Sequence, residues 1–366
     1  MDWKEQIIRE CFERKLPTVL LGSGASISSG FSLKLKPNFP GMPDLAKRYY
    51  ETVVPDSFGD EDQAAWQQFK GDYESLGAEW WKFNLEAFLT KHPLQNSSQL
   101  LKQLLRQTAE ALQVPHKALA ELFEKDAKIQ FPLRTILERL LRSAPTSNPE
   151  INVITPNYDL LVEYTADLIK VPCLTGFSGG IIRHWNPDAG FAPPFVRAGN
   201  GFKRSKYLRL IKPHGSFAWH QSQADSGLVV EHFALAGPGG DWSRCMIAPG
   251  PSKYAEALKD VRRDHMRHMD DAFKNAQSLL VIGYGFNDSH LEEYLKRSLA
   301  RGTPAIFVTR DATEEARANF VSLYPQVTCI TSDSHVGCVV QRGSKREHIP
   351  SEPLWELGRF TEEFVH

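Results

Sequence analysis

A short apolar run that ends in a glycine-rich turn constrains this chain more than any other feature. Residues 18–30 read TVLLGSGASISSG, and the apolar residues 19–21 predict a buried strand. A helix that begins near Ser26 would point its N-terminus and the N–H groups of the turn at an anion, typically a pyrophosphate. The stretch departs from G-x-G-x-x-G because Ile27 stands at the third glycine position, so an ordinary tight turn is the alternative.

Five further apolar runs predict strands, and helical patterns separate most of them. They are residues 152–155, 207–212, 279–282, 305–308 and 327–331. Strands that alternate with helices predict an α/β protein with a doubly wound, mostly parallel, Rossmann-like sheet. The polar turns GSGAS, TPNYD, PHGS, GYGFND and TRD each follow a strand. Ligands bind at the carboxyl ends of such strands, so these turns are expected to converge on one dinucleotide cleft.

The chain between the first two predicted strands is helical in pattern almost throughout, from about residue 61 to 143. We therefore expect three parts. Residues 1–58 begin the nucleotide-binding domain, residues 59–148 form an all-helical insertion, and residues 149–366 complete the domain and end in a helix. Residues 173–206 are expected to form a long ordered loop over the site, and a polar loop is expected to follow PHGS through Asp241.

Charge and cysteine content exclude several classes of protein. The 366 residues contain 43 Lys and Arg against 44 Asp and Glu, so direct nucleic-acid binding is not expected. The sequence contains no secretory signal and no membrane-spanning run, which predicts a cytoplasmic protein. Five scattered cysteines without a CxxC pair indicate neither disulfides nor a zinc ribbon. Asp264, His265 and His268 have a spacing that could suit a metal, but a solvated helix face is favoured and no metal is expected.

In their order, GSGAS with a second glycine, TPNYD, PHG and IGYGFND resemble the sirtuin-like NAD-binding fold, in the branch found in bacterial antiphage defence proteins. The resemblance spans residues 16–331 apart from the helical insertion. It implies that NAD+ is bound as the substrate. The residues that it places around NAD+ are Gly22, Ser23, Gly24, Ala25 and Ser26 at the pyrophosphate; Asn157 and Asp159 beside the nicotinamide and its ribose; His214 near that ribose; Gly283, Gly285 and Asn287 in the second phosphate and ribose turn; and Thr309 and Arg310 at the adenosine half.

The chemistry of nicotinamide–ribose cleavage suits two of these residues as catalytic groups. The reaction passes through an oxocarbenium-like state, so the protein must hold the ribose and place one nucleophile. The amide of Asn157 can orient a water or the nicotinamide, and His214 can accept a proton from a ribose hydroxyl or from that water. The alternatives are a turn residue for Asn157 and a core histidine for His214, while Asp159 is expected to cap the following helix.

Departures from the sirtuin pattern direct the expected activity away from deacylation. The chain lacks the two zinc-binding CxxC pairs of sirtuin deacylases, and its first loop reads KLKPNFPGMPDL instead of containing PDFR. The resemblance therefore implies an NAD+ glycohydrolase that yields nicotinamide and ADP-ribose and depletes NAD+ in infected cells. A module that binds NAD or ADP-ribose without turnover and a zinc-less protein deacylase are the alternatives.

A toxic NADase needs restraint, and the sequence contains no recognisable sensor domain. Regulation is therefore expected to come from assembly or from a partner. A homo-oligomer is expected, and the resemblance implies a HerA-type ATPase, an Argonaute-like protein or a phage-protein trigger as candidate partners. The helical insertion is the candidate contact surface.

Overall fold

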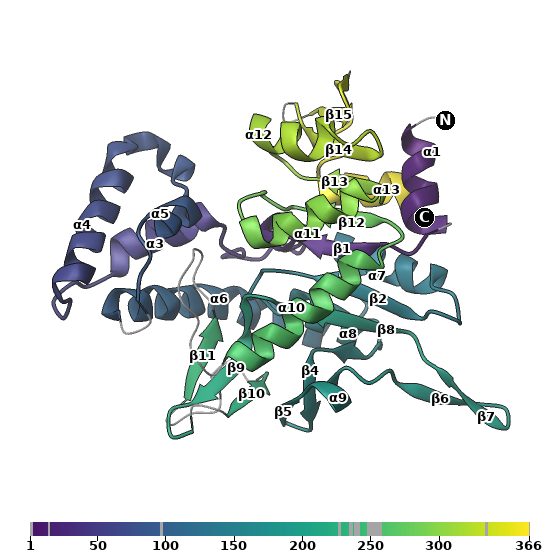
Figure 1. Ribbon diagram of the computed structural model, residues 1–366, viewed down its shortest axis with the longest axis horizontal. Helices are drawn as coiled ribbons and strands as arrows, with labels where there is room; N and C mark the ends of the chain where they lie inside the picture. Colours follow the sequence, from purple (N-terminus) through teal and green to yellow (C-terminus); the bar gives the residue numbers. More distant parts are fainter. Residues whose placement is uncertain are drawn as a thin grey trace.

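A nine-stranded sheet forms the centre of the computed structural model (Figure 1). The structure describes residues 3–13, 15–95, 98–225, 228–233, 237, 242–246, 258–333 and 336–365. The strand order is β16-β15-β14-β13-β12-β1-β2-β8-β3. Their bounds are β1 Thr18–Leu21, β2 Glu150–Ile154, β3 Cys173–Leu174, β8 Tyr207–Ile211, β12 Leu279–Ile282, β13 Ala305–Val308, β14 Val327–Ser332, β15 Cys338–Arg342 and β16 Lys345–Ile349.

Apart from the two-residue β3, which is also parallel, six strands of this sheet run parallel and give it a doubly wound topology. In the chain these strands come in the order β1, β2, β8, β12, β13 and β14, with other elements between them. In the sheet they lie in the order β8-β2-β1-β12-β13-β14. Strands β1, β2 and β8 extend one half of the sheet in one direction. The chain then returns to the other side of β1, where β12, β13 and β14 extend the second half in the opposite direction. The predicted α/β fold with a mostly parallel sheet is confirmed, and the boundary between β1 and β12 is the switch point at which such sheets bind ligands.

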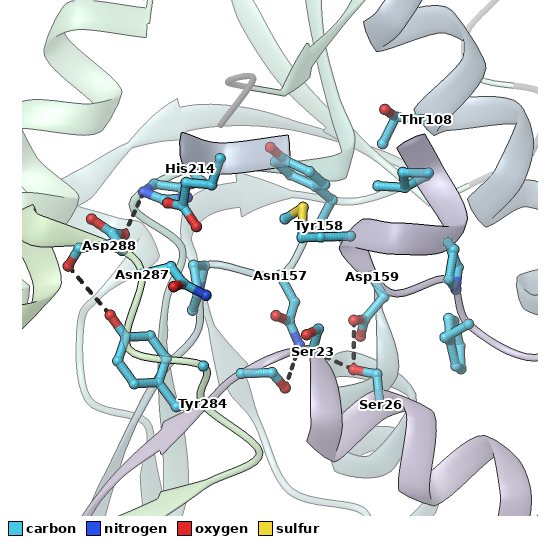
Figure 2. Close-up of a pocket in the computed structure, with 18 of the residues that line it drawn as sticks. Ser23, Ser26, Thr108, Asn157, Tyr158, Asp159, His214, Tyr284, Asn287 and Asp288 are labelled. Atoms are coloured by element: carbon cyan, nitrogen blue, oxygen red, sulfur yellow. Dashed lines mark hydrogen bonds and ion pairs between the residues drawn. The ribbon is translucent and has the colours of Figure 1, made fainter. Parts of the chain in front are cut away.

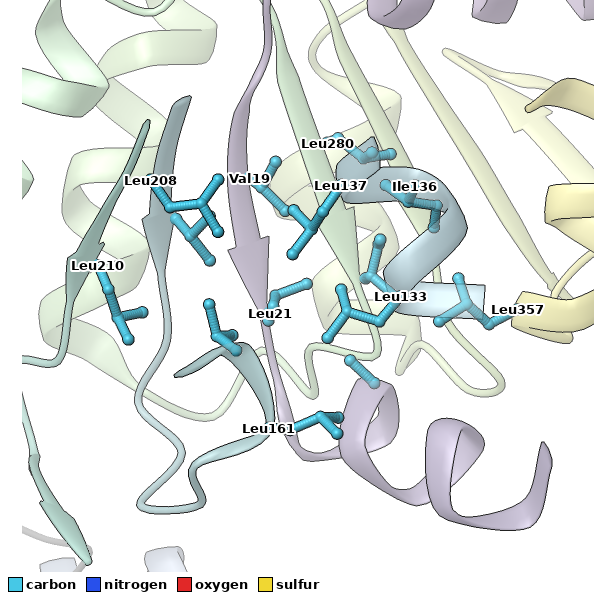
Figure 3. Close-up of a cluster of buried hydrophobic side chains, with 14 of the residues drawn as sticks. Val19, Leu21, Leu133, Ile136, Leu137, Leu161, Leu208, Leu210, Leu280 and Leu357 are labelled. Carbon is cyan, nitrogen blue, oxygen red and sulfur yellow. The ribbon is translucent and has the colours of Figure 1, made fainter. Parts of the chain in front are cut away.

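Alternate residues of β1 point into two separate cores, which explains why the strand is apolar throughout. Val19 and Leu21 pack on one face among side chains of α7 (Figure 3), whereas Leu20 packs on the other face. Helices on the first face are α1 Trp3–Ile8 with η1 Arg9–Glu13, α2 Ser23–Ser32, α7 Pro132–Ser143, α8 Leu161–Leu168 and α13 Leu357–Phe364. Helices on the second face are α10 Leu258–Lys274, α11 Ser289–Ala300 and α12 Glu314–Arg317 with η3 Ala318–Ser322.

Helices α3 to α6, residues 42–125, form what we call the helical module (Figure 1, left). Its elements are α3 Met42–Thr52, α4 Asp60–Ser75, η2 Gly77–Lys82, α5 Leu85–Lys91 and α6 Gln99–Lys125. The helices α4 to α7 follow the helical pattern predicted over residues 61–143, but α3 precedes the predicted insertion and α7 packs on the sheet. The bounds 59–148 of the insertion stay a prediction. Helix α6 joins two cores, because Leu104 packs inside the module and Leu119 packs against the sheet. Pro115 lies inside this helix, between the two.

A second, antiparallel sheet occupies residues that the sequence analysis assigned to loops. Its order is β11-β9-β10-β5-β4, and a separate hairpin, β6–β7, projects from the body (Figure 1). The elements are β4 Gly176–Gly179, β5 Ile182–Asn186, α9 Pro187–Gly190, β6 Phe195–Ala198, β7 Gly201–Arg204, β9 Gly215–Ser222, β10 Val229–His232 and β11 Trp242–Met246. The loop predictions for residues 173–206 and for the segment after PHGS are therefore wrong.

Buried polar pairing explains why these strands do not look apolar in the sequence. Glu231 of β10 is fully buried, yet its carboxylate accepts hydrogen bonds from Thr175 and Trp219 and pairs with Arg183. Such a strand carries charge without facing water. Within the described ranges, no helix combines the length and apolarity needed to cross a bilayer.

Truncating a side chain of the sheet core is expected to destabilise the fold strongly. Leu133 of α7 is 0% exposed, so Leu133→Ala should lower the free energy of unfolding by about 2–5 kcal/mol through a cavity and lost burial. Leu323 is 67% exposed, and Leu323→Ala should change the free energy of unfolding by less than about 0.5 kcal/mol. Urea unfolding followed by circular dichroism compares the two, and equal losses would contradict this packing.

Candidate active site

A cavity opens at the switch point of the sheet, where the loops after β1, β2, β8 and β12 meet the helical module (Figure 2). Predicted site residues that line it are Gly22, Ser23, Ser26, Asn157, Asp159, His214, Gly285 and Asn287. Residues from the front, middle and rear of the sequence thus share one cavity. The other lining residues are Phe39, Pro40, Met42, Leu45, Glu86, Thr108, Leu112, Pro156, Tyr158, Tyr284 and Asp288.

The glycines of the two turns allow the backbones that follow β1 and β12 to touch. A Cβ on Gly22 would lie 2.4 Å from the Gly283 carbonyl oxygen, and the Gly24 N–H donates a 3.0 Å hydrogen bond to that oxygen. Gly283 has a φ of +60°, which favours glycine. Helix α2 starts at Ser23, three residues before the predicted Ser26. The turn is therefore shorter than expected, and its glycines serve close packing.

The expected anion cradle is only partly available, because several turn N–H groups bind within the protein. The N–H of Gly22 donates to Ile282, that of Gly24 to Gly283 and that of Ala25 to Gly22. What remains for an anion is the N-terminal end of α2, where Ser23 lines the cavity.

The amide of Asn157 is fixed in one orientation by the first turn. Its Nδ2 donates hydrogen bonds of 2.9 Å to the Gly22 carbonyl oxygen and 3.1 Å to Ser26 Oγ. Because both amide hydrogens are engaged on that side, the amide oxygen is directed away from the turn, into the cavity (Figure 2). Asn157 therefore presents an uncharged acceptor to whatever occupies the cavity.

Asp159 lines the cavity and makes local hydrogen bonds, and its place beside the nicotinamide ribose stays a prediction. Its Oδ2 accepts a 2.7 Å hydrogen bond from Ser26 Oγ, and its Oδ1 accepts a 3.0 Å hydrogen bond from the Leu161 N–H at the start of α8. The buried Lys212 ammonium donates a hydrogen bond to the Asp159 carbonyl oxygen and pairs with the Glu163 carboxylate at 2.7 Å. These bonds hold the TPNYD turn against α2 and β8.

His214 pairs with Asp288, a residue that sequence reasoning missed. The two side chains approach to 3.0 Å between Nε2 and Oδ2 (Figure 2). Asp288 Oδ1 caps helix α11 by accepting from the N–H groups of His290 and Leu291. Burial raises the pKa of Asp288, but the bonds from His214 and the two N–H groups outweigh it, and the pKa lies below its usual value. The available signal was an Asp at a helix start, directly after Asn287.

Glu86 of α5 is the second missed residue. Burial, followed by the charges of Asp288 and Glu292, raises the pKa of its carboxyl to about 8. Helical periodicity assigned this segment only to the all-helical insertion, and no signal in the sequence connected it with the nucleotide turns.

Other predicted residues lie beside the cavity or away from it. Gly24, Ala25 and Gly283 form the turn contact but do not line the cavity, and neither do Thr309 and Arg310 after β13. Arg310 is exposed and pairs with Asp311 at 2.8 Å. The adenosine role of these last two residues stays a prediction.

Of the possible metal ligands in α10, His265 does not lie on a solvated face as expected, whereas Asp264 and His268 are partly exposed. His265 is 0% exposed and packs against Trp185 and Trp219, with Nδ1 accepting from the Lys212 N–H. Burial lowers the pKa of His265 to about 3. No group of three or more potential metal ligands occurs in the described part of the chain.

Comparison with known proteins finds a family that matches the part of the chain from residue 151 to residue 324. Residues 151–324 match the family described as SIR2-like domain, and the match includes Asn157, His214 and Asp288. No curated protein matches the chain. Among solved structures, a Sir2 homologue in an ADP-ribose complex has a TM-score of 0.41 at 14% identity, over 85% of this chain and 86% of that one. A Sir2–p53 peptide–NAD+ structure has a TM-score of 0.33 at 14% identity, over 86% of this chain and 89% of that one.

Adding one methyl group at the turn contact should damage both stability and the cavity. Gly22→Ala places a Cβ against the Gly283 and Tyr284 backbone, which cannot move freely, and should lower the free energy of unfolding by about 1–3 kcal/mol. Gly71 of α4 has nothing within 4 Å, so Gly71→Ala should raise that free energy by about 0.5–1 kcal/mol. Thermal unfolding of both variants tests the contact, which an unchanged Gly22→Ala protein would contradict.

Proposed function

We propose that this protein is an NAD+ glycohydrolase that cleaves the nicotinamide–ribose bond to give nicotinamide and ADP-ribose. The observation that carries the proposal is the fixed amide of Asn157, whose oxygen faces the cavity that also contains the His214–Asp288 pair. The SIR2-like match over residues 151–324 supports NAD+ as the ligand.

The proposed reaction assigns a separate task to each of these groups. The C–N bond breaks with its electron pair moving to the nicotinamide nitrogen, which leaves neutral, and water adds to the cationic ribose carbon and loses one proton. The amide oxygen of Asn157 accepts a hydrogen bond from the water or from the nicotinamide carboxamide. With Nε2 lying 3.0 Å from the Asp288 carboxylate, His214 has Nδ1 to accept a hydrogen bond or proton from a ribose hydroxyl or the water.

Removing the fixed amide should abolish most turnover and leave the fold intact. We expect Asn157→Ala to lower kcat by on the order of 10²-fold or more, because the oriented acceptor is lost. Asn275 is exposed at the end of α10, and Asn275→Ala should behave like the parent. Chromatographic assay of nicotinamide and ADP-ribose measures both. A parent protein that binds NAD+ but forms no product, alone and with a genomic partner, would instead indicate a binding module.

Neutralising the partner of His214 should also reduce turnover. Asp288→Asn keeps the shape of the side chain but removes the charge that orients and stabilises a protonated imidazole, so kcat should fall by on the order of 10-fold to 10³-fold. Because the Asp288 pKa is lowered in the fold, its stabilising contribution is present at neutral pH and is lost as pH falls through that pKa. The variant should therefore be less stable than the parent at pH 7 and should approach it at low pH.

The cellular role that we propose is antiphage defence by NAD+ depletion in the cytoplasm. It rests on the order of the motifs, which resembles the defence branch of the sirtuin-like fold. Such an activity requires restraint, and we propose control through a homo-oligomer or a partner such as a HerA-type ATPase. Measuring the solution mass and NAD+ consumption with and without the product of the adjacent gene tests this role.

A further inference from the structure

We propose that Glu86 of the helical module is a further catalytic residue of the cavity, and that its carboxylate takes the proton from the attacking water. This inference rests on the proposed NAD+ cleavage and assigns it a base from outside the SIR2-like match. It also makes the helical module part of the active site.

The geometry of α5 turns Glu86 toward the cavity. Leu85, Phe88 and Leu89 of this helix are buried in the core of the module, whereas Glu86 lines the cavity beside the nucleotide turns. The helix is held at its N-terminus by Asn84, whose Oδ1 accepts a 2.9 Å hydrogen bond from the Ala87 N–H. The Glu86 backbone is therefore fixed from both sides, by packing and by the cap.

The rest of the module supports the same wall of the cavity. Met42 and Leu45 of α3 and Thr108 and Leu112 of α6 also line it. The carboxyl is thus part of a composite wall made by three helices of the module.

In the absence of substrate, negative charge dominates around the carboxyl of Glu86. Asp288 and Glu292 contribute negative charge, and His214, Asp159, Tyr158 and Tyr284 are the other titratable groups that line the cavity. Among the described residues that line it, none is a lysine or arginine. Burial is the largest cause that raises the pKa of Glu86 to about 8, so the group is mainly protonated at neutral pH.

The substrate supplies the missing cation. The nicotinamide ring of NAD+ carries a positive charge, and the ribose becomes cationic during cleavage. A cation in this cavity favours the ionised carboxylate, so binding of NAD+ is expected to release a proton from Glu86. The carboxylate then accepts one proton from water while the water oxygen bonds to the ribose carbon and the nicotinamide leaves with the C–N electron pair. The proton taken from water restores the protonated resting state of Glu86, so the single proton that the reaction yields is the one released when NAD+ binds.

A base of this kind has a distinct pH signature. In the parent, kcat/KM should rise with pH up to about 8 and then level off, because the free enzyme must lose the Glu86 proton. Glu86→Gln keeps the size and hydrogen bonding of the protonated group but cannot ionise. It should lose this rise and lower kcat by on the order of 10²-fold to 10⁴-fold. Glu121→Gln, on an exposed part of α6, is the matched control and should keep the parental profile.

Proton release on binding gives a readout that does not depend on turnover. In an Asn157→Ala background, calorimetry in two buffers of different ionisation enthalpy should show protons released when NAD+ binds at pH 7.5. Release should be much smaller with ADP-ribose, which lacks the nicotinamide cation, and should disappear when Glu86→Gln is added.

The outcomes separate the two proposals. A parent that cleaves NAD+ and a Glu86→Gln variant with the same pH profile and kcat would overturn the role of Glu86 alone. A parent that binds NAD+ without cleaving it would overturn both. Equal proton release with and without Glu86→Gln would place the titrating group elsewhere and also reject Glu86.

Discussion

The close approach of two backbones, after β1 and after β12, is the constraint on which the rest of the site depends. These strands are sequence-distant but adjacent in the sheet, and the Gly24 N–H to Gly283 carbonyl bond joins the turns that follow them. No side chain fits between the turns. Once they meet, the Gly22 carbonyl lies where it can orient the Asn157 amide, and the loop after Gly283 brings Asp288 to His214. The glycines thus determine side-chain geometry through the backbone.

The site is shared between two structural parts with separate cores. The strand-end loops contribute the amide and the His–Asp pair, whereas the helical module contributes a carboxyl and several apolar walls. A carboxyl in such a wall is costly to ionise without a cation. Packing alone does not explain a carboxyl at this position, because an apolar side chain would fill the same wall without that cost.

The sequence predicted the parallel sheet and most of the residues at the carboxyl ends of its strands, because an apolar run followed by a polar turn is a local signal. It missed Glu86 because a helix periodicity does not reveal which face meets a distant cavity. It missed the antiparallel sheet because strands such as β10 contain Glu231, whose charge is paired internally. His265 likewise looked solvated beside charged neighbours, although aromatic rings surround it. Each error concerns a contact between residues far apart in the chain.

Pro115 interrupts the hydrogen-bond ladder of α6 between Leu104, which packs in the core of the helical module, and Leu119, which packs in the sheet core. Immediately after it, His116 Nε2 accepts from the Leu160 N–H and anchors the second half of the helix near the TPNYD turn. The first half packs in the core of the module. Because proline has no N–H to donate, the two halves of α6 are joined by one backbone hydrogen bond fewer, and bending the helix would cost least at this residue.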